Sequence, residues 1–103
     1  MRSRALAQLP KPVADDLARL GEIIRDARGR RGLTQADLAE RLRLSPTTVR
    51  AAEQGDPAVA AGILASLLWT LGIGPISSGV VATHPEARQP KQRVRAGKRV
   101  DDF

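Results

Sequence analysis

Two helix-capping sequences that lie close together constrain this chain more than any other feature. Thr34 is a good N-cap, and Asp37 stands three residues later, where its carboxylate can return a hydrogen bond to the first turn. Ser45 is a second N-cap, and the proline that follows it fits the first position of a helix. The sequence therefore predicts two short helices, at about residues 35–42 and 46–54, joined by a tight turn.

A longer helix is predicted before this pair, and another after it. Apolar residues at helical steps mark the first over residues 13–31, although Gly21 and Gly29 weaken it. Residues 60–71 carry an apolar stripe broad enough for a helix that is buried on more than one side. Residues 78–83 contain two adjacent valines and are predicted to form a short strand or an extended loop. The apolar positions are Val13, Leu17, Leu20 and Ile24 in the first helix and Ile63, Leu64, Leu67, Leu68 and Leu71 in the last.

The length and charge of the chain predict one folded domain with basic ends. The chain has 103 residues and is 42% hydrophobic, which is enough for a single core. Its net charge of +6 lies at the two ends, because the middle of the chain holds as many acidic as basic residues. We expect a flexible arm over residues 1–12, a folded domain over residues 13–75 and an extended or disordered basic tail over residues 76–103. Basic ends on a neutral body are typical of a polyanion binder, and a solvated tail that only aids solubility is the alternative.

Enzymatic chemistry is not expected of this composition. The chain has no cysteine or tyrosine and no glycine-rich phosphate loop, and its single histidine, His84, has no plausible partner. We therefore expect neither a cofactor nor a metal site. The sequence also has no apolar run long enough to span a bilayer and no secretory leader, so we expect a cytoplasmic protein without membrane contact.

The residues around the capped pair resemble those of the Xre/Cro family of helix-turn-helix regulators. The resemblance covers about residues 20–73 and implies an all-α, lambda-repressor-like bundle of four to five helices with a disordered basic C-terminal tail. It also implies a sequence-specific transcriptional repressor that binds double-stranded operator DNA as a homodimer. The matching positions are Leu20, Ile24, Arg28, Gly32, Leu33, Thr34, Gln35, Leu38, Ala39, Leu42, Ser45, Thr48, Val49, Glu53, Gln54 and Gly55.

The resemblance implies a DNA-binding site on the capped pair of helices. Gln35 begins the first of them, with its backbone and side-chain amides aimed outward, where similar proteins hold a DNA phosphate. The second helix resembles the one that enters the major groove, with Arg50 as the candidate reader of guanine and Thr47 as a second base-reading candidate. The full predicted DNA-binding set is Thr34, Gln35, Ser45, Pro46, Thr47, Thr48, Arg50 and Ala51.

An ion pair in this family ties the first helix to the reading helix, and Arg28 and Glu53 occupy its positions. Two unrelated surface charges are the alternative.

Two residues depart from the family pattern. Arg43 stands in the turn where the family has a left-handed glycine, at a cost of about 1 kcal/mol. Ala52 is smaller than the residue usual there and leaves a gap that a neighbour such as Trp69 can fill.

Three further segments resemble one subgroup of this family. Residues 55–60, residues 68–72 and the sequence Asp101-Asp102-Phe103 are similar to HipB-like antitoxins, which are encoded beside HipA-like kinases. This resemblance implies the antitoxin of a type II toxin–antitoxin module, which represses its own operon and binds a HipA-like serine/threonine kinase toxin. Trp69 and Phe103 are the candidate partner-binding residues, with a core tryptophan and an inert chain end as the alternatives. A stand-alone or phage-type repressor and a protein-interaction module without DNA binding also stay open.

Overall fold

The computed structural model describes Leu6 and residues 8–83, and helices are the only regular secondary structure in that part of the chain. The element that organises the fold is α2 (Lys11–Arg30), a helix of 20 residues. The all-α prediction is confirmed for the described residues. The other helices are α3 (Gln35–Leu42), α4 (Pro46–Glu53), α5 (Ala61–Thr70) and α6 (Ser78–Thr83).

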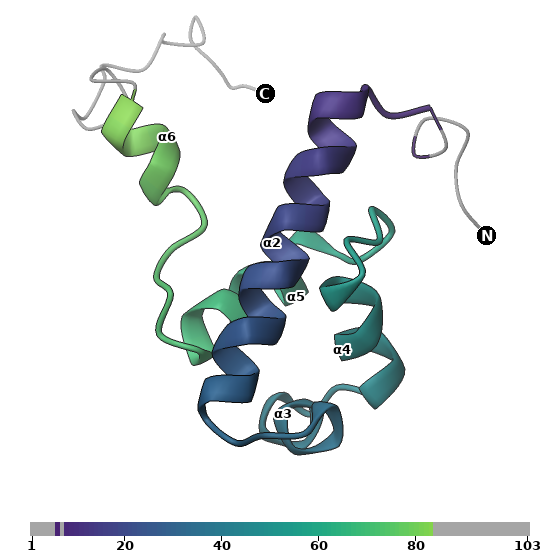
Figure 1. The fold of residues 1–103 in the computed structure, drawn as a ribbon, viewed down its shortest axis with the longest axis vertical. Helices are drawn as coiled ribbons and strands as arrows, with labels where there is room; N and C mark the ends of the chain where they lie inside the picture. Colours follow the sequence, from purple (N-terminus) through teal and green to yellow (C-terminus); the bar gives the residue numbers. More distant parts are fainter. Residues whose placement is uncertain (1–5, 7, 84–103) are drawn as a thin grey trace, which may run out of the picture.

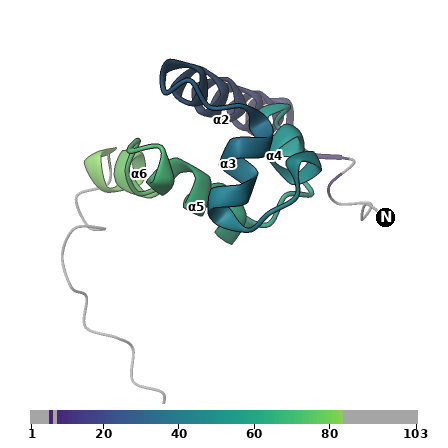
Figure 2. The ribbon, with the colours of Figure 1, turned by 90° about the horizontal axis from the view of Figure 1, so that it is seen from below.

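The short helices are arranged around the C-terminal half of α2. Helix α4 lies beside α2, α3 lies beneath them, and α5 lies behind α2 (Figure 1). The view from below shows α3 in the middle of the molecule, with α2 and α4 on one side of it and α5 on the other (Figure 2). An extended connection leads from α5 to α6, which stands apart from α4 in both views.

The core lies where α2, α3, α4 and α5 meet. Ile24 of α2, Val49 of α4 and Leu67 of α5 are fully buried. Burial decreases toward the N-terminus of α2, where Leu17 is half-buried and Val13 is 43% exposed, because α2 extends beyond the helices that pack on it (Figure 1). The predicted apolar stripe of the first helix therefore faces the core only over its C-terminal half. The remaining buried hydrophobic residues are Leu38, Ala39, Ala52, Leu68 and Leu71.

The helix ends agree closely with the sequence pattern, with one shift at the start of α2. That helix begins at Lys11 rather than at Val13, since Pro10 is the N-cap and Pro12 fits the first turn, where no backbone donor is needed. Lys11 also pairs with Asp15 one turn later, at 2.8 Å on the exposed surface. The last two residues of the predicted flexible arm therefore belong to the helix, while residues 1–5 and 7 lie outside the described residues.

The prediction of a strand or an extended loop over residues 78–83 is wrong, because this segment forms helix α6. The pair of adjacent valines favours a strand only weakly, and such preferences depend on context. A turn in which the Ser78 amide donates to the Pro75 carbonyl at 3.1 Å starts the helix. The Thr83 hydroxyl donates to the Gly79 carbonyl at 3.0 Å within it. The rest of the predicted tail, residues 84–103, lies outside the described residues.

The sequence suggested that Trp69 fills a gap beside Ala52, and this prediction is wrong. The Trp69 side chain is 70% exposed, while Ala52 is only 2% exposed. The backbone of Ala52 instead lies directly against α2, since a Cβ added to Gly21 would lie 2.8 Å from the Ala52 carbonyl oxygen. A small residue on α4 therefore matches a small residue on α2.

Two glycines make this close approach of α2 and α4 possible. A Cβ at Gly21 would lie 2.3 Å from the carbonyl oxygen of Glu53, which is closer than any real contact. At Gly55, just after α4, a Cβ would lie 2.7 Å from the Cα of Ala18, and the positive φ of 75° there independently favours glycine. Gly21 is thus a packing residue and not the weak point that helix propensity alone indicates.

Gly21→Ala should destabilise the protein by about 1 to 3 kcal/mol, because the added methyl group has to push two backbones apart. Gly29→Ala in the same helix is the matched control. It has no atom within 4 Å of the added Cβ and should stabilise the protein by about 0.4 to 1 kcal/mol. Urea unfolding of both variants measures the difference. Equal stabilities would show that the two helices are not in backbone contact at Gly21.

Candidate nucleic-acid interface

The two short helices begin with the caps that the sequence predicts. The Thr34 hydroxyl accepts a hydrogen bond from the Asp37 amide at 3.0 Å, and the Asp37 carboxylate accepts one from the Thr34 amide at 2.9 Å. The hydrogen bond from the Thr34 backbone amide, and after it the Thr34 side chain, lower the pKa of the Asp37 carboxyl below its ordinary value. The capping box is therefore confirmed, and its carboxylate is ionised at neutral pH.

The cap of α4 uses Ser45 in the same way. Its hydroxyl accepts from the Thr48 amide at 3.1 Å and lies 2.9 Å from the Thr48 hydroxyl. Pro46 occupies the first turn, as predicted. The hydroxyl groups of Thr34 and Ser45 thus cap the starts of α3 and α4, and the Thr48 hydroxyl is in contact with that of Ser45. Any contact of these residues with DNA has to share atoms with the caps.

The turn between the two helices contains the predicted left-handed residue. Arg43 has φ 57° and ψ 42°, and among the described residues it alone combines a positive φ with a side chain. The turn is closed by the Leu44 amide, which donates to the Ala39 carbonyl at 2.8 Å. This conformation costs a non-glycine residue about 1 kcal/mol.

The predicted ion pair between α2 and α4 is present and shielded from water. The Arg28 Nε donates to one carboxylate oxygen of Glu53, and its Nη2 donates to the other at 3.1 Å. Their side chains are 16% and 4% exposed. The hydrogen bonds to Glu53 raise the pKa of Arg28 above its ordinary value, so the guanidinium group of Arg28 stays charged. The Arg28 Nη1 also donates to the Leu33 carbonyl at 2.8 Å, which connects the pair to the loop before α3.

The prediction that the Gln35 side chain points outward is wrong. Its Nε2 donates to Glu53 at 2.9 Å, on the oxygen that also accepts from Arg28 Nη2. A buried carboxylate needs several donors to offset the loss of water, and Gln35 is the donor that α3 can supply. One carboxylate therefore connects α2, α3 and α4.

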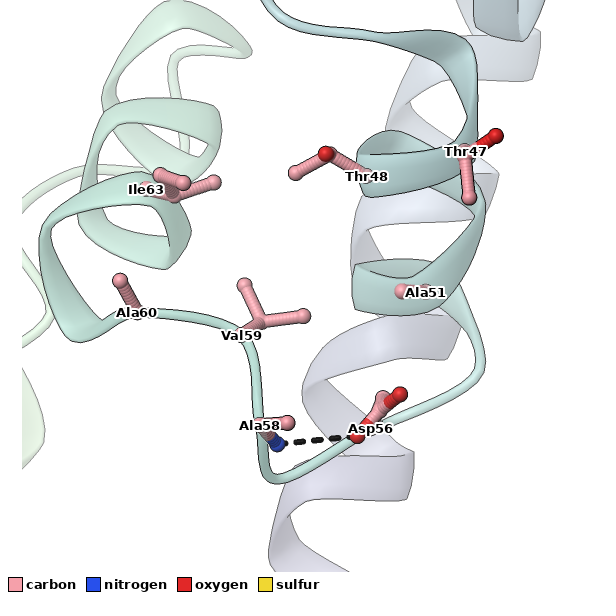
Figure 3. Close-up of a pocket in the computed structure, with 8 residues that line it drawn as sticks. All are labelled: Thr47, Thr48, Ala51, Asp56, Ala58, Val59, Ala60 and Ile63. Carbon is pink, nitrogen blue, oxygen red and sulfur yellow. Dashed lines mark hydrogen bonds between the residues drawn. The ribbon is translucent and has the colours of Figure 1, made fainter. Parts of the chain in front are cut away.

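The outer face of α4 presents most of the residues predicted to read bases. Pro46, Thr47 and Arg50 are exposed, whereas Thr48 and Ala51 are half-buried. Thr48 and Ala51 border an apolar groove of about 350 Å³ between α4 and the segment that leads into α5. Val59 and Ile63 lie across the groove from Thr48, and the hydroxyl group of Thr47 points away from it (Figure 3).

The segment opposite α4 is shaped by Asp56, whose carboxylate accepts a hydrogen bond from the Ala58 amide at 2.9 Å (Figure 3). This bond turns the chain sharply between Gly55 and the start of α5. The exposed face of α4 consequently projects beside a short loop rather than beneath another helix. That arrangement leaves Pro46, Thr47 and Arg50 on α4 exposed to solvent.

Comparison with known protein families agrees with this geometry. A family model described as a helix-turn-helix domain matches residues 19–76. The chain belongs to the helix-turn-helix domain family. Helices α3 and α4 form the helix-turn-helix itself, and membership of this family makes the protein a DNA-binding regulator. No curated protein and no solved structure matches the chain significantly.

The helix-turn-helix borders a second depression that sequence reasoning missed. Six polar residues line a cavity of about 230 Å³, namely Arg25, Arg28, Gln35, Arg50, Glu53 and Gln54. Arg25 and Gln54 were not among the predicted site residues. A signal for Arg25 was present, since it precedes Arg28 by three residues and such residues share a helix face.

Within residues 6 and 8–83, no group of three or more histidine and carboxylate side chains could hold a metal ion. No helix in the same residues is long and apolar enough to cross a membrane. Of the two predicted partner-binding residues, Trp69 lies on α5, outside the helix-turn-helix, and Phe103 lies outside the described residues.

Glu53→Gln should destabilise the helix-turn-helix protein by about 3 kcal/mol, because it leaves the guanidinium of Arg28 buried without its counter-charge. Glu40→Gln removes an exposed carboxylate from α3 and should change stability by less than about 0.5 kcal/mol. Thermal and urea unfolding compare the two variants. A loss for Glu53→Gln as small as for Glu40→Gln would contradict a structural role of the pair.

Proposed function

We propose that this chain is a sequence-specific transcriptional repressor, which binds its operator with α4 in the major groove. The observation that carries this proposal is the fixed orientation of α4. Glu53 at its C-terminal end is held by Arg28 and Gln35, and Gly21 allows close packing against α2. The exposed side chains of Pro46, Thr47 and Arg50 therefore project from a rigid support, as base reading requires.

In this proposal, Arg50 is the principal base-reading residue. Its side chain is exposed and has no hydrogen-bond or ion-pair partner within the described residues, so its fork of donors can address the N7 and O6 atoms of guanine. Thr47 offers a hydroxyl and a methyl group one turn earlier on the same face. The start of α3, whose capping box orders its first turn, faces the phosphate backbone and sets the register.

A second copy of the chain completes the operator complex in this proposal. One recognition helix reaches only a few base pairs, and dimers of helix-turn-helix proteins read two half-sites. The C-terminal end of α5 and the segment after it support such a dimer, since Trp69 is 70% exposed and Ile73 and Ile76 are 43% and 47% exposed. A hollow of about 360 Å³ lined by Trp69, Gly72 and Gly74 lies at the same place. An isologous contact needs such a patch to meet its own copy.

We further propose that the repressor is the HipB-like antitoxin of a type II toxin–antitoxin module and binds a HipA-like kinase. The support is the resemblance of residues 55–60, residues 68–72 and Asp101-Asp102-Phe103 to such antitoxins. The basic residues that precede Asp101 are part of this resemblance. The protein itself would carry no catalytic activity and need no cofactor, and it would act in the cytoplasm. A stand-alone or phage-type repressor is the alternative if no kinase partner exists. Loss of DNA binding at moderate salt would leave a protein-interaction module.

Arg50→Ala should cost about 1 to 3 kcal/mol of operator affinity and relax specificity at one base pair. Gln35→Ala is the comparison, because this side chain holds Glu53 and reads no base, so operator and random DNA should lose affinity alike. Fluorescence anisotropy on a palindromic operator, found by selection from random duplexes, measures both losses and should give two chains per duplex. Equal losses on operator and random DNA for Arg50→Ala would remove that residue from base reading.

Phe103→Ala should weaken kinase binding and leave operator binding intact. A chain segment that orders on binding needs an anchor, and a phenylalanine can bury about 150 Å² or more. The kinase is first identified by pull-down from the native host, and calorimetry then compares wild type and variant. The antitoxin proposal fails if the host yields no kinase partner, and the anchor alone fails if the variant binds the kinase as tightly as wild type.

A further inference from the structure

The polar cavity between α2, α3 and α4 contains more positive charge than its own residues can neutralise. Three of its six lining residues are arginines, and Glu53 is the only acidic one. The lining residues come from the C-terminal half of α2, from the start of α3 and from the end of α4 with its cap. An arginine side chain carries five donors and no acceptor. The cavity is therefore rich in donors and poor in acceptors.

Glu53 already accepts three hydrogen bonds from other residues of this group. Its two carboxylate oxygens accept from Nε and Nη2 of Arg28 and from Nε2 of Gln35. This leaves Arg25 and Arg50 without a hydrogen-bond or ion-pair partner among the residues that the structure describes. Two unpaired guanidinium groups that line one cavity repel each other unless an anion lies nearby.

We propose that Arg25 binds a phosphate group of the DNA backbone in this cavity. A phosphate supplies the negative charge and the acceptor oxygens that the cavity lacks, and its geometry matches the donor fork of arginine. Water occupies about 30 Å³ per molecule in the liquid, so a cavity of about 230 Å³ has room for a phosphate group. Arg50 remains a base reader, and its charge adds to the field that attracts the phosphate.

The position of the cavity identifies the source of the phosphate as DNA. Arg50 and Gln54 belong to the end of α4 and its cap, so a duplex that holds α4 in its major groove brings its backbone past the same cavity. Arg25 then adds a contact from α2, outside the helix-turn-helix. This inference rests on the proposed docking of α4.

Arg25→Gln should make the negative slope of log affinity against log salt shallower by about 0.9 for each phosphate contact that is lost, or about 1.8 for two chains on one duplex, and weaken binding about tenfold at low salt. The loss should be the same on operator and on random duplex, since a phosphate carries no sequence information. Arg19→Gln is the matched control, because Arg19 is exposed on the same helix and does not line the cavity. Its slope should equal that of the wild type.

Anisotropy titrations of the full-length variants over a salt series make the measurement, with thermal melts to verify that both variants fold. A wild type that binds no duplex would refute the proposed function as a whole. Wild-type binding with the same slope for Arg25→Gln as for Arg19→Gln would refute only the role of Arg25. A second set of melts compares sodium phosphate with sodium chloride at equal ionic strength. If Arg25→Gln abolishes stabilisation by inorganic phosphate and leaves the DNA slope unchanged, the cavity binds a free anion and the proposal is wrong.

Discussion

The backbone contact between α2 and the end of α4 supports the rest of the structure. Gly21 meets the carbonyl oxygens of Ala52 and Glu53, and Gly55 meets α2 one turn earlier, at Ala18. Because neither glycine has a side chain, the two helices approach without an intervening layer of atoms. Farther along α2, Arg28 can therefore reach both carboxylate oxygens of Glu53 with its Nε and Nη2. The angle of α4 follows from these contacts, and α4 is the helix that we propose enters the major groove.

A single carboxylate gives this arrangement its rigidity. Glu53 accepts from Arg28 on α2 and from Gln35 on α3, while it belongs to α4. A buried charge is costly unless several donors surround it, so the three helices are held in the one arrangement that supplies them. The same arrangement leaves Arg25 and Arg50 with unused donors at the edge of the site. The charges of Arg28 and Glu53 neutralise each other and stabilise the fold, whereas the charges of Arg25 and Arg50 have no partner within the described residues and are, in our proposal, available to DNA.

Helix α5 shows how well a hydrophobic pattern predicts which side chains are buried. Helix α5 is apolar on most of its surface, and Leu67 and Leu68 are buried as that pattern predicts. Trp69, the next residue, is exposed. An apolar side chain can be covered by the same chain or by a partner, and periodicity does not distinguish the two. The large exposed patch around Trp69 is what makes a second copy the natural partner in our proposal.

Features that depend on neighbouring residues could be predicted from the sequence. The caps at Thr34 and Ser45 and the ends of α3 and α4 follow from hydrogen bonds that span only a few residues. The left-handed turn at Arg43 was predicted from the family resemblance. The pairing of Arg28 with Glu53 was predicted only through the family resemblance, since these residues are far apart in the chain. Four other features became apparent only in the folded protein: the inward turn of Gln35, the contact at Gly21, the place of Arg25 in the site and the outward side chain of Trp69. Each of these depends on which helix lies against which, and no local preference contains that information.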